Sequence, residues 1–221
     1  MNIYLGKNID GRVVNADLRD IKHLLIVGKT GAGKTDFIGA IIRDFISKHK
    51  SDAIKFCLFS DCWFLLKDEI SPEYLLYGAE KSIAKSEDEA NDLLDCILTD
   101  MSVRLGKLTQ NVSDFPESEN MPEIVLLFDN NAFYYRSEIN EKINKIIGCG
   151  NNIGVHVIFS LQHISQRDET SIAVFPSVLC GKLSSEKEYK KLHGIKITEM
   201  PGEFRFTLKS PVCSENVRCD I

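Results

Sequence analysis

The stretch that decides the fold reads His23-Leu24-Leu25-Ile26-Val27-Gly28-Lys29-Thr30-Gly31-Ala32-Gly33-Lys34-Thr35. Its first part is a short apolar run ended by a glycine, which is typical of a buried parallel strand. Its second part fits the pattern G-x-x-x-x-G-K-[ST] at every fixed position. From Lys34 to Lys48, isoleucine and phenylalanine recur at helical spacing. A strand, a glycine-rich loop and a helix in this order predict a triphosphate-binding site.

The residues of this loop have the properties that a triphosphate requires. Glycines let the backbone approach phosphate oxygens, and the loop amides and the positive end of the helix hold the negative charge. We expect ATP to bind at Gly28, Lys29, Thr30, Gly31, Ala32, Gly33, Lys34 and Thr35. Lys34 is expected to bridge the β- and γ-phosphates, and the Thr35 hydroxyl to bind Mg²⁺. A glycine-rich turn that fits by chance is the alternative.

A second metal ligand is expected at the end of another apolar strand. Residues 124–128 are apolar and are followed by Asp129, which we expect to bind Mg²⁺; a capping carboxylate is the alternative. In ATPases of this kind the next residue is commonly a glutamate that accepts a proton from the attacking water. Here it is Asn130, and loss of a general base lowers turnover by roughly 10²–10⁴-fold. Hydrolysis therefore stays open, while ATP binding does not depend on this position.

The remaining pattern predicts strands that alternate with helices. An Asp10-Gly11 pair indicates an N-terminal β-hairpin within residues 1–20. The core, residues 21–221, is expected to hold strands at 54–59, 124–128, 155–161 and 203–208, and helices at 86–108, at 137–147 and from residue 185. Capping boxes are expected at Ser86–Glu89 and Ser185–Glu188. The pattern assigns no secondary structure to residues 60–85, and it predicts an exposed loop at 110–122. The fold class is thus α/β, a mostly parallel doubly wound sheet in one domain, residues 1–221.

Composition limits the partners and the compartment. The net charge of −5 argues against a surface coated in basic residues for tight nucleic-acid binding, although a local basic patch remains compatible with it. The seven cysteines form neither a disulfide framework nor a zinc pattern, which favours reduced thiols. No run approaches a membrane span of about 20 apolar residues. We expect a cytoplasmic chain without direct membrane contact, either free or tethered to the inner face of the membrane through a larger parent protein.

Several blocks resemble counterparts in the FtsK/SpoIIIE family of P-loop ATPases, which pump double-stranded DNA through a hexameric ring. Besides the strand and P-loop already quoted, these are Leu5-Gly6-Lys7-Asn8-Ile9-Asp10-Gly11, Asn152-Ile153-Gly154-Val155-His156-Val157-Ile158 leading to Gln162, and Met200-Pro201-Gly202-Glu203-Phe204-Arg205-Phe206. The resemblance covers nearly the entire chain in the same order. It implies a RecA-like fold with ATP between neighbouring subunits, Lys34 and Thr35 in the P-loop roles, Asp129 on the magnesium and Gln162 as the γ-phosphate sensor.

The chain also departs from the family pattern. The usual Asp-Glu pair reads Asp129-Asn130, the Gln-Arg-Pro-Ser sensor segment reads Gln162-His163-Ile164-Ser165, and the Asp-Pro-Lys after the second strand reads Asp61-Cys62-Trp63. These departures put both hydrolysis and sequence-directed DNA tracking in doubt and are typical of a divergent member. EssC-type ATPases of type VII protein secretion, which carry such domains in tandem, are close relatives; DNA-transfer ATPases of plasmids are another.

Two functions therefore stay open. The first is a DNA translocase that works as a ring, a hexamer in this family, with double-stranded DNA as its partner. The second is a degenerate nucleotide-binding module of an EssC-like secretion ATPase, with weak or no hydrolysis, tandem ATPase domains as neighbours and a secreted protein as its substrate. Family frequency favours the first, whereas Asn130 and the acidic net charge favour the second.

Other residues have competing interpretations. Gln162 is either the sensor or an ordinary glutamine at a strand end, and His156 fits a packed strand histidine better than a ligand. Residues 63–66 form either a contact patch between subunits or part of the core. Arg104 and Arg167 are either fingers for a neighbour's γ-phosphate or, as we favour, ordinary surface arginines.

Overall fold

The computed structural model describes residues 1–8, 10–60, 62–108, 121–129, 137–164, 173–192, 205–209 and 214–218. The chain forms two compact units, one made of residues 1–44 with 158–221, the other of residues 45–157. The unit boundaries fall within helix α2 (Lys34–Lys48) and strand β7 (Val155–Leu161). Among the described helices, none combines the length and the apolar character that a membrane crossing requires.

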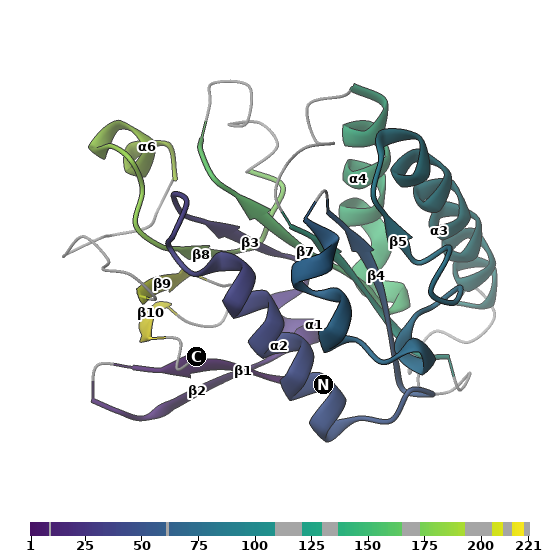
Figure 1. Ribbon diagram of the computed structural model, residues 1–221, viewed down its shortest axis with the longest axis horizontal. Coiled ribbons are helices and arrows are strands. Elements are labelled where there is room, and N and C mark those ends of the chain that lie inside the picture. Colours follow the sequence, from purple (N-terminus) through teal and green to yellow (C-terminus); the bar gives the residue numbers. More distant parts are fainter. Residues whose placement is uncertain are drawn as a thin grey trace. The chain divides into compact units, whose positions relative to one another are not determined.

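The first unit opens with the expected β-hairpin. Strands β1 (Asn2–Lys7) and β2 (Val13–Asp17) pair antiparallel, and Gly11 in the turn has a φ of 78° that favours glycine. Strand β1 also pairs antiparallel with β10 (Ser214–Arg218), as Figure 1 shows. The hairpin is therefore part of a larger sheet.

Six strands of this unit follow in the order β2-β1-β10-β9-β8-β3, with residues 158–161 of β7 beside β3. Strand β9 (Arg205–Lys209) pairs antiparallel with both of its neighbours, whereas β8 (Ser177–Cys180) and β3 (Leu24–Val27) are parallel. All of β3 is buried, as its unbroken apolar run predicts. The unit also contains the short helices α1 (Leu18–Ile21) and α6 (Glu186–Lys191) and residues 34–44 of α2.

The second unit is a parallel sheet next to helices. Strands β4 (Ile54–Phe59), β5 (Ile83–Ala84) and β6 (Glu123–Phe128) are parallel, in the order β6-β4-β5. Helices α3 (Glu87–Leu108) and α4 (Ser137–Cys149) lie side by side and both contact the turn η5 (Gly150–Ile153). The apolar stripes expected on both helices are buried, including Leu94 and Ile97 on α3 and Ile143 and Ile146 on α4.

The structure confirms the expected α/β class with a mostly parallel sheet, but it adds elements that the pattern did not predict. Residues 60–85 hold three short 3₁₀ turns, η1 (Trp63–Leu65), η2 (Lys67–Glu69) and η3 (Pro72–Tyr74), as well as strand β5. Strands β8 and β10 were also missed, so the strand expected at 203–208 is not the last one. Most of the loop expected at 110–122 lies outside the described residues.

The two expected capping boxes differ. Before α3, the Ser86 hydroxyl accepts a hydrogen bond from the Glu89 amide at 3.3 Å, as the box requires. The Glu89 carboxylate accepts one from the Lys85 amide at 2.7 Å, one residue earlier than the box requires. At α6, the Ser185 side chain makes no capping bond, so that half of the prediction was wrong. The Glu188 carboxylate accepts instead from the Ser184 amide at 3.3 Å, one residue earlier than the box requires.

Candidate nucleotide-binding site

The P-loop leaves strand β3 through a close backbone approach at Gly28. The Gly28 amide donates to the Leu161 carbonyl of β7 at 3.0 Å. A Cβ atom at Gly28 would lie 3.0 Å from the Ala32 Cβ and 3.6 Å from the Lys182 carbonyl oxygen. A side chain at this position would therefore need Ala32 to give way by a few tenths of an ångström.

The loop turns through backbone conformations that only glycine adopts easily. Gly31 has a φ of 78° and Gly33 a φ of 84°. The Ala32 amide donates to the Lys29 carbonyl at 3.1 Å, and α2 then begins at Lys34. The first amides of a helix lack intrahelical partners and carry a partial positive charge, so the start of α2 can hold an anion.

Lys34 is buried and lies against the loop that precedes it. Its side chain is 7% exposed, and its ammonium donates to the Gly28 carbonyl at 2.6 Å and to the Lys29 carbonyl at 3.2 Å. These bonds keep a buried charge satisfied next to the helix start. A phosphate at the loop can accept from the same ammonium, because it offers stronger, charged acceptors than a carbonyl does.

A second segment, which the sequence pattern did not predict, holds the P-loop by backbone hydrogen bonds. The Gly181 amide donates to the Val27 carbonyl at 2.7 Å, and the Lys29 amide donates to the Lys182 carbonyl at 2.7 Å. This support segment, residues 181–183, follows strand β8 directly. The signal in the sequence was the apolar run Val178-Leu179-Cys180 ended by a glycine, the same pattern that marks β3.

Gln162 lies next to the P-loop. It follows β7, which pairs parallel with β3. The Thr30 hydroxyl donates to the Gln162 side-chain oxygen at 3.4 Å. The described structure thus brings this candidate sensor to the loop.

Asp129 occupies the end of strand β6 in the other unit. Its side chain is buried, and its amide donates to the Phe59 carbonyl at 3.0 Å. The Phe59 and Phe128 rings stack at 4.2 Å between centroids, which fixes the strand ends before the carboxylate. Asn130 lies outside the described residues.

These donors fit ATP and magnesium by their chemistry. Loop amides, a helix start and a buried ammonium suit phosphate oxygens. The half-buried Thr35 is the second residue of α2 and carries a hydroxyl, and Asp129 carries a carboxylate. Both are the hard oxygen ligands that Mg²⁺ takes.

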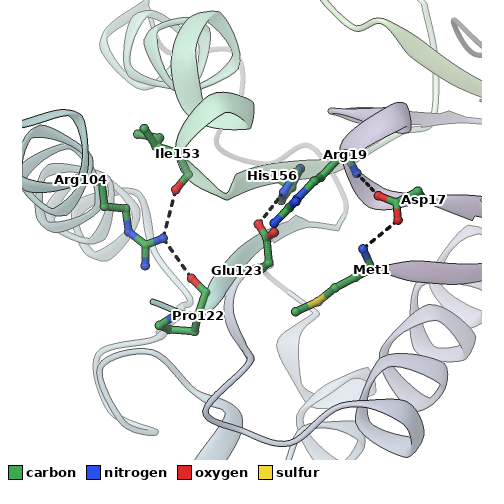
Figure 2. A network of polar contacts seen from close by, with 8 residues as sticks. All are labelled: Met1, Asp17, Arg19, Arg104, Pro122, Glu123, Ile153 and His156. Carbon is green, nitrogen blue, oxygen red and sulfur yellow. Dashed lines mark hydrogen bonds and ion pairs between the residues drawn. The ribbon is translucent and has the colours of Figure 1, made fainter. Parts of the chain in front are cut away.

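Neither interpretation of Arg104 was right. Its side chain is 1% exposed, and one guanidinium nitrogen donates to the Pro122 carbonyl at 3.0 Å and to the Ile153 carbonyl at 3.1 Å (Figure 2). Its Nε atom pairs with Asp100 at 3.0 Å. A side chain bound in this way is neither a surface arginine nor able to reach a neighbour's nucleotide. Arg167, the other candidate, lies outside the described residues.

His156 is a packed strand histidine, as expected. Its ring is fully buried, and its Nε2 atom lies 3.0 Å from the Glu123 carboxylate (Figure 2).

In the patch at 63–66, Phe64 is 55% and Leu65 is 54% exposed, whereas Leu66 is buried. The ammonium groups of Lys67 and Lys85 lie 5.2 and 4.6 Å from the Trp63 ring.

The cysteines near the strands are unreactive by environment. The five whose placement is described are free thiols. Burial raises the pKa of Cys180, on β8, to about 12, with a smaller contribution from Glu188. Burial likewise raises the pKa of Cys57 well above its ordinary value. Neither thiol supplies a thiolate at neutral pH.

Known proteins resemble the chain over nearly its whole length. A model described as the FtsK/SpoIIIE family matches residues 1–61. The chain is 28% identical over 209 residues to the DNA translocase FtsK of Chlorobaculum tepidum, covering 86% of this chain and 26% of that protein. It is 24% identical over 211 residues to the DNA translocase SpoIIIE of Bacillus subtilis, with the same shares. The chain thus spans about a quarter of these relatives.

Solved structures show the same fold. The conjugation coupling protein TcpA of pCW3, in a monomer form with ATPγS, has a TM-score of 0.76 at 18% identity and covers 98% of this chain and 65% of that one. ATPases 2 and 3 of EssC from Geobacillus thermodenitrificans give a TM-score of 0.78 at 12% identity, with 98% and 43% covered.

Proposed function

We propose that the chain, a divergent member of the FtsK/SpoIIIE family, is an ATP-binding motor domain. It couples the binding and slow hydrolysis of ATP to the movement of double-stranded DNA. The observation that carries the proposal is the P-loop. Buried Lys34 donates to loop carbonyls at the start of α2, where Gly31 and Gly33 take positive φ angles. The names of the relatives and the ATPγS in the TcpA structure support it.

Each residue of the proposed site has a defined role. Residues 28–35 hold the triphosphate through their amides, and the Lys34 ammonium bridges the β- and γ-phosphates. Thr35 and Asp129 hold Mg²⁺, which neutralises phosphate charge when bound. Gln162, held beside the loop by Thr30, senses the γ-phosphate. Asn130 leaves the general-base position without a proton acceptor, so slow hydrolysis is part of the proposal.

The proposal includes an assembly and a compartment. Residues 1–221 act as one domain, and copies of it form a ring, a hexamer, with nucleotide between subunits. Double-stranded DNA passes along the ring. Because ATP is supplied in the cytoplasm, we place the domain there, either free or tethered to the membrane through a larger parent protein.

Titration with Mg-ATP tests the phosphate site. Lys34→Ala should weaken binding by about 10- to 100-fold, because hydrogen bonds to charged groups contribute about 1.5–3 kcal/mol. Lys145→Ala, an exposed lysine on α4, is the matched control and should bind like the unaltered protein. Equal affinity of Lys34→Ala and the unaltered protein would overturn the site.

Hydrolysis with and without double-stranded DNA tests the motor. We expect DNA to stimulate phosphate release, and the stimulation to fall steeply as salt rises, because phosphate contacts release counterions. ATP binding without DNA affinity at any salt concentration would contradict translocation while leaving the nucleotide site intact.

A second function has observations of its own. The EssC likeness extends over 98% of the chain, and Asn130 and the net charge of −5 suit a module that binds nucleotide with little turnover. In this version the partners are tandem ATPase domains and a secreted protein substrate. Saturable Mg-ATP binding, no hydrolysis and no DNA affinity together would favour it.

A further inference from the structure

Helix α6 contacts both segments that flank the P-loop in the first unit. One is the support segment, residues 181–183, whose Lys182 carbonyl accepts from the Lys29 amide of the P-loop at 2.7 Å. The other is the sensor segment, residues 162–164, whose Gln162 accepts from Thr30 at 3.4 Å. Each of these segments therefore touches the P-loop directly, and each is also bonded to α6.

Tyr189 is the main contact from α6 to the support segment. Its hydroxyl accepts a hydrogen bond from the Leu183 amide at 2.8 Å and lies 3.4 Å from the Gly181 carbonyl, to which it donates. These residues flank Lys182. Burial raises the pKa of Tyr189, although the bond from Leu183 acts in the opposite direction. The hydroxyl thus keeps the proton that it donates to Gly181.

Glu188 and Lys191 reach the sensor segment. The Lys191 ammonium donates to the Ile164 carbonyl at 3.3 Å. The Glu188 carboxylate accepts from the Ser184 amide at 3.3 Å, and its second oxygen lies 3.9 Å from the His163 ring. One short helix thus bonds to two segments that each also bond to the P-loop.

We propose that α6 is a clip that holds the P-loop in its phosphate-binding shape, with Tyr189 as the positioning residue that fixes the support segment. The inference rests on the proposed function, because the shape that it fixes is that of the nucleotide site. The physical reason is the chain of backbone bonds. If Gly181 and Leu183 shift, the Lys182 carbonyl moves from the Lys29 amide, and the loop loses the bond that sets where its amides point.

Tyr189→Phe tests the clip, because it removes only the hydroxyl. Hydrogen exchange followed by mass spectrometry should show faster exchange in the peptides covering 28–33 and 181–184, since the Leu183 amide loses its acceptor. The Mg-ATP dissociation constant should rise about three- to tenfold, the range for one or two ordinary hydrogen bonds. Saturating Mg-ATP should restore protection in both peptides, because the coupling of two sites is reciprocal.

Tyr74→Phe is the matched control. The Tyr74 hydroxyl donates to the His49 carbonyl at 2.9 Å in the other unit, so this variant also loses a hydrogen bond to backbone but should leave both peptides and the affinity unchanged. Equal effects of the two variants, or unchanged exchange in Tyr189→Phe, would overturn the clip. If the unaltered protein takes up no Mg-ATP, the proposed function fails, and exchange in the ATP-free protein still decides whether Tyr189 positions the P-loop.

Discussion

Buried polar side chains lie at both ends of the parallel strands, but their partners differ from one end to the other. At the carboxyl ends, buried Lys34 lies in the loop and helix after β3 in one unit, and buried Asp129 follows β6 in the other; the half-buried Gln162 follows β7. At the amino ends, Glu123 opens β6 and pairs with His156 near the start of β7. Arg104 bonds to carbonyls just before these two strands.

The two buried cations among the described residues show how the partners differ between the strand ends. Lys34 and Arg104 are 7% and 1% exposed, and both donate to backbone carbonyls. Arg104 ties together segments far apart in the sequence and also has a carboxylate partner, Asp100. Lys34 donates to carbonyls five and six residues back, within a loop shaped for an anion. Burial alone therefore does not mark a functional cation; its partners do.

The largest effect is expected at the carboxyl end of β6. Asn130→Glu restores a proton acceptor at the general-base position and should raise ATP turnover by about 10²-fold or more. Phosphate release from the purified protein with saturating Mg-ATP measures it. Mg-ATP affinity should change little, because the phosphate contacts stay in place.

Asn130→Gln is the control for this substitution, since it lengthens the side chain without adding a base. It should turn over no faster than the unaltered protein. Ordinary motor-like turnover in the unaltered protein would contradict the idea that Asn130 limits hydrolysis, and an inert Asn130→Glu would show that the defect lies elsewhere.

The sequence predicted the carboxyl-end site better than the amino-end network, for a physical reason. A P-loop is a local pattern: its glycines, lysine and helix start stand within residues 28–35, and an unbroken apolar strand precedes it. Arg104 acts through contacts 18 and 49 residues away, which no local pattern contains. One signal was present, because Arg104 takes a place in the apolar stripe of α3 after Ile97 and Met101.

The missed strands have similar explanations. Strand β8 has four residues, and β10 reads Ser-Glu-Asn-Val-Arg, with a single apolar side chain. Strand β5 has two residues, which pair with Leu58 and Phe59 at the end of β4. Such short elements form because a neighbouring strand offers backbone partners, which is a tertiary effect that periodicity does not carry.

At the amino ends, the largest stability loss is expected from Arg104→Met. Two buried carbonyls lose their donor, and breaking a buried polar network by removing one partner costs about 3 kcal/mol or more. Urea unfolding at neutral pH measures the loss. The exposed Arg12→Met is the control and should change stability by less than about 0.5 kcal/mol.

Arg104→Lys keeps the charge but loses the planar fork, so its loss should fall between those of the methionine variant and the unaltered protein. It also keeps the test usable if Arg104→Met does not fold. In every folded variant the Mg-ATP affinity should stay unchanged. Weakened ATP binding in the folded Arg104→Lys protein would break the contrast between the two strand ends.

The smallest effect is expected from Glu123→Gln, which keeps the shape of the side chain and one hydrogen bond to His156. Replacing a charged acceptor at 3.0 Å by a neutral one should reduce the free energy of unfolding by about 1 kcal/mol, because charge-assisted bonds are roughly twice as strong as neutral ones. Glu141→Gln, an exposed position on α4, provides the matched baseline in the same urea titration. A loss no greater than that baseline would mean that the pair is held in place by packing alone, whereas a change in Mg-ATP affinity would mean that the amino ends take part in nucleotide binding.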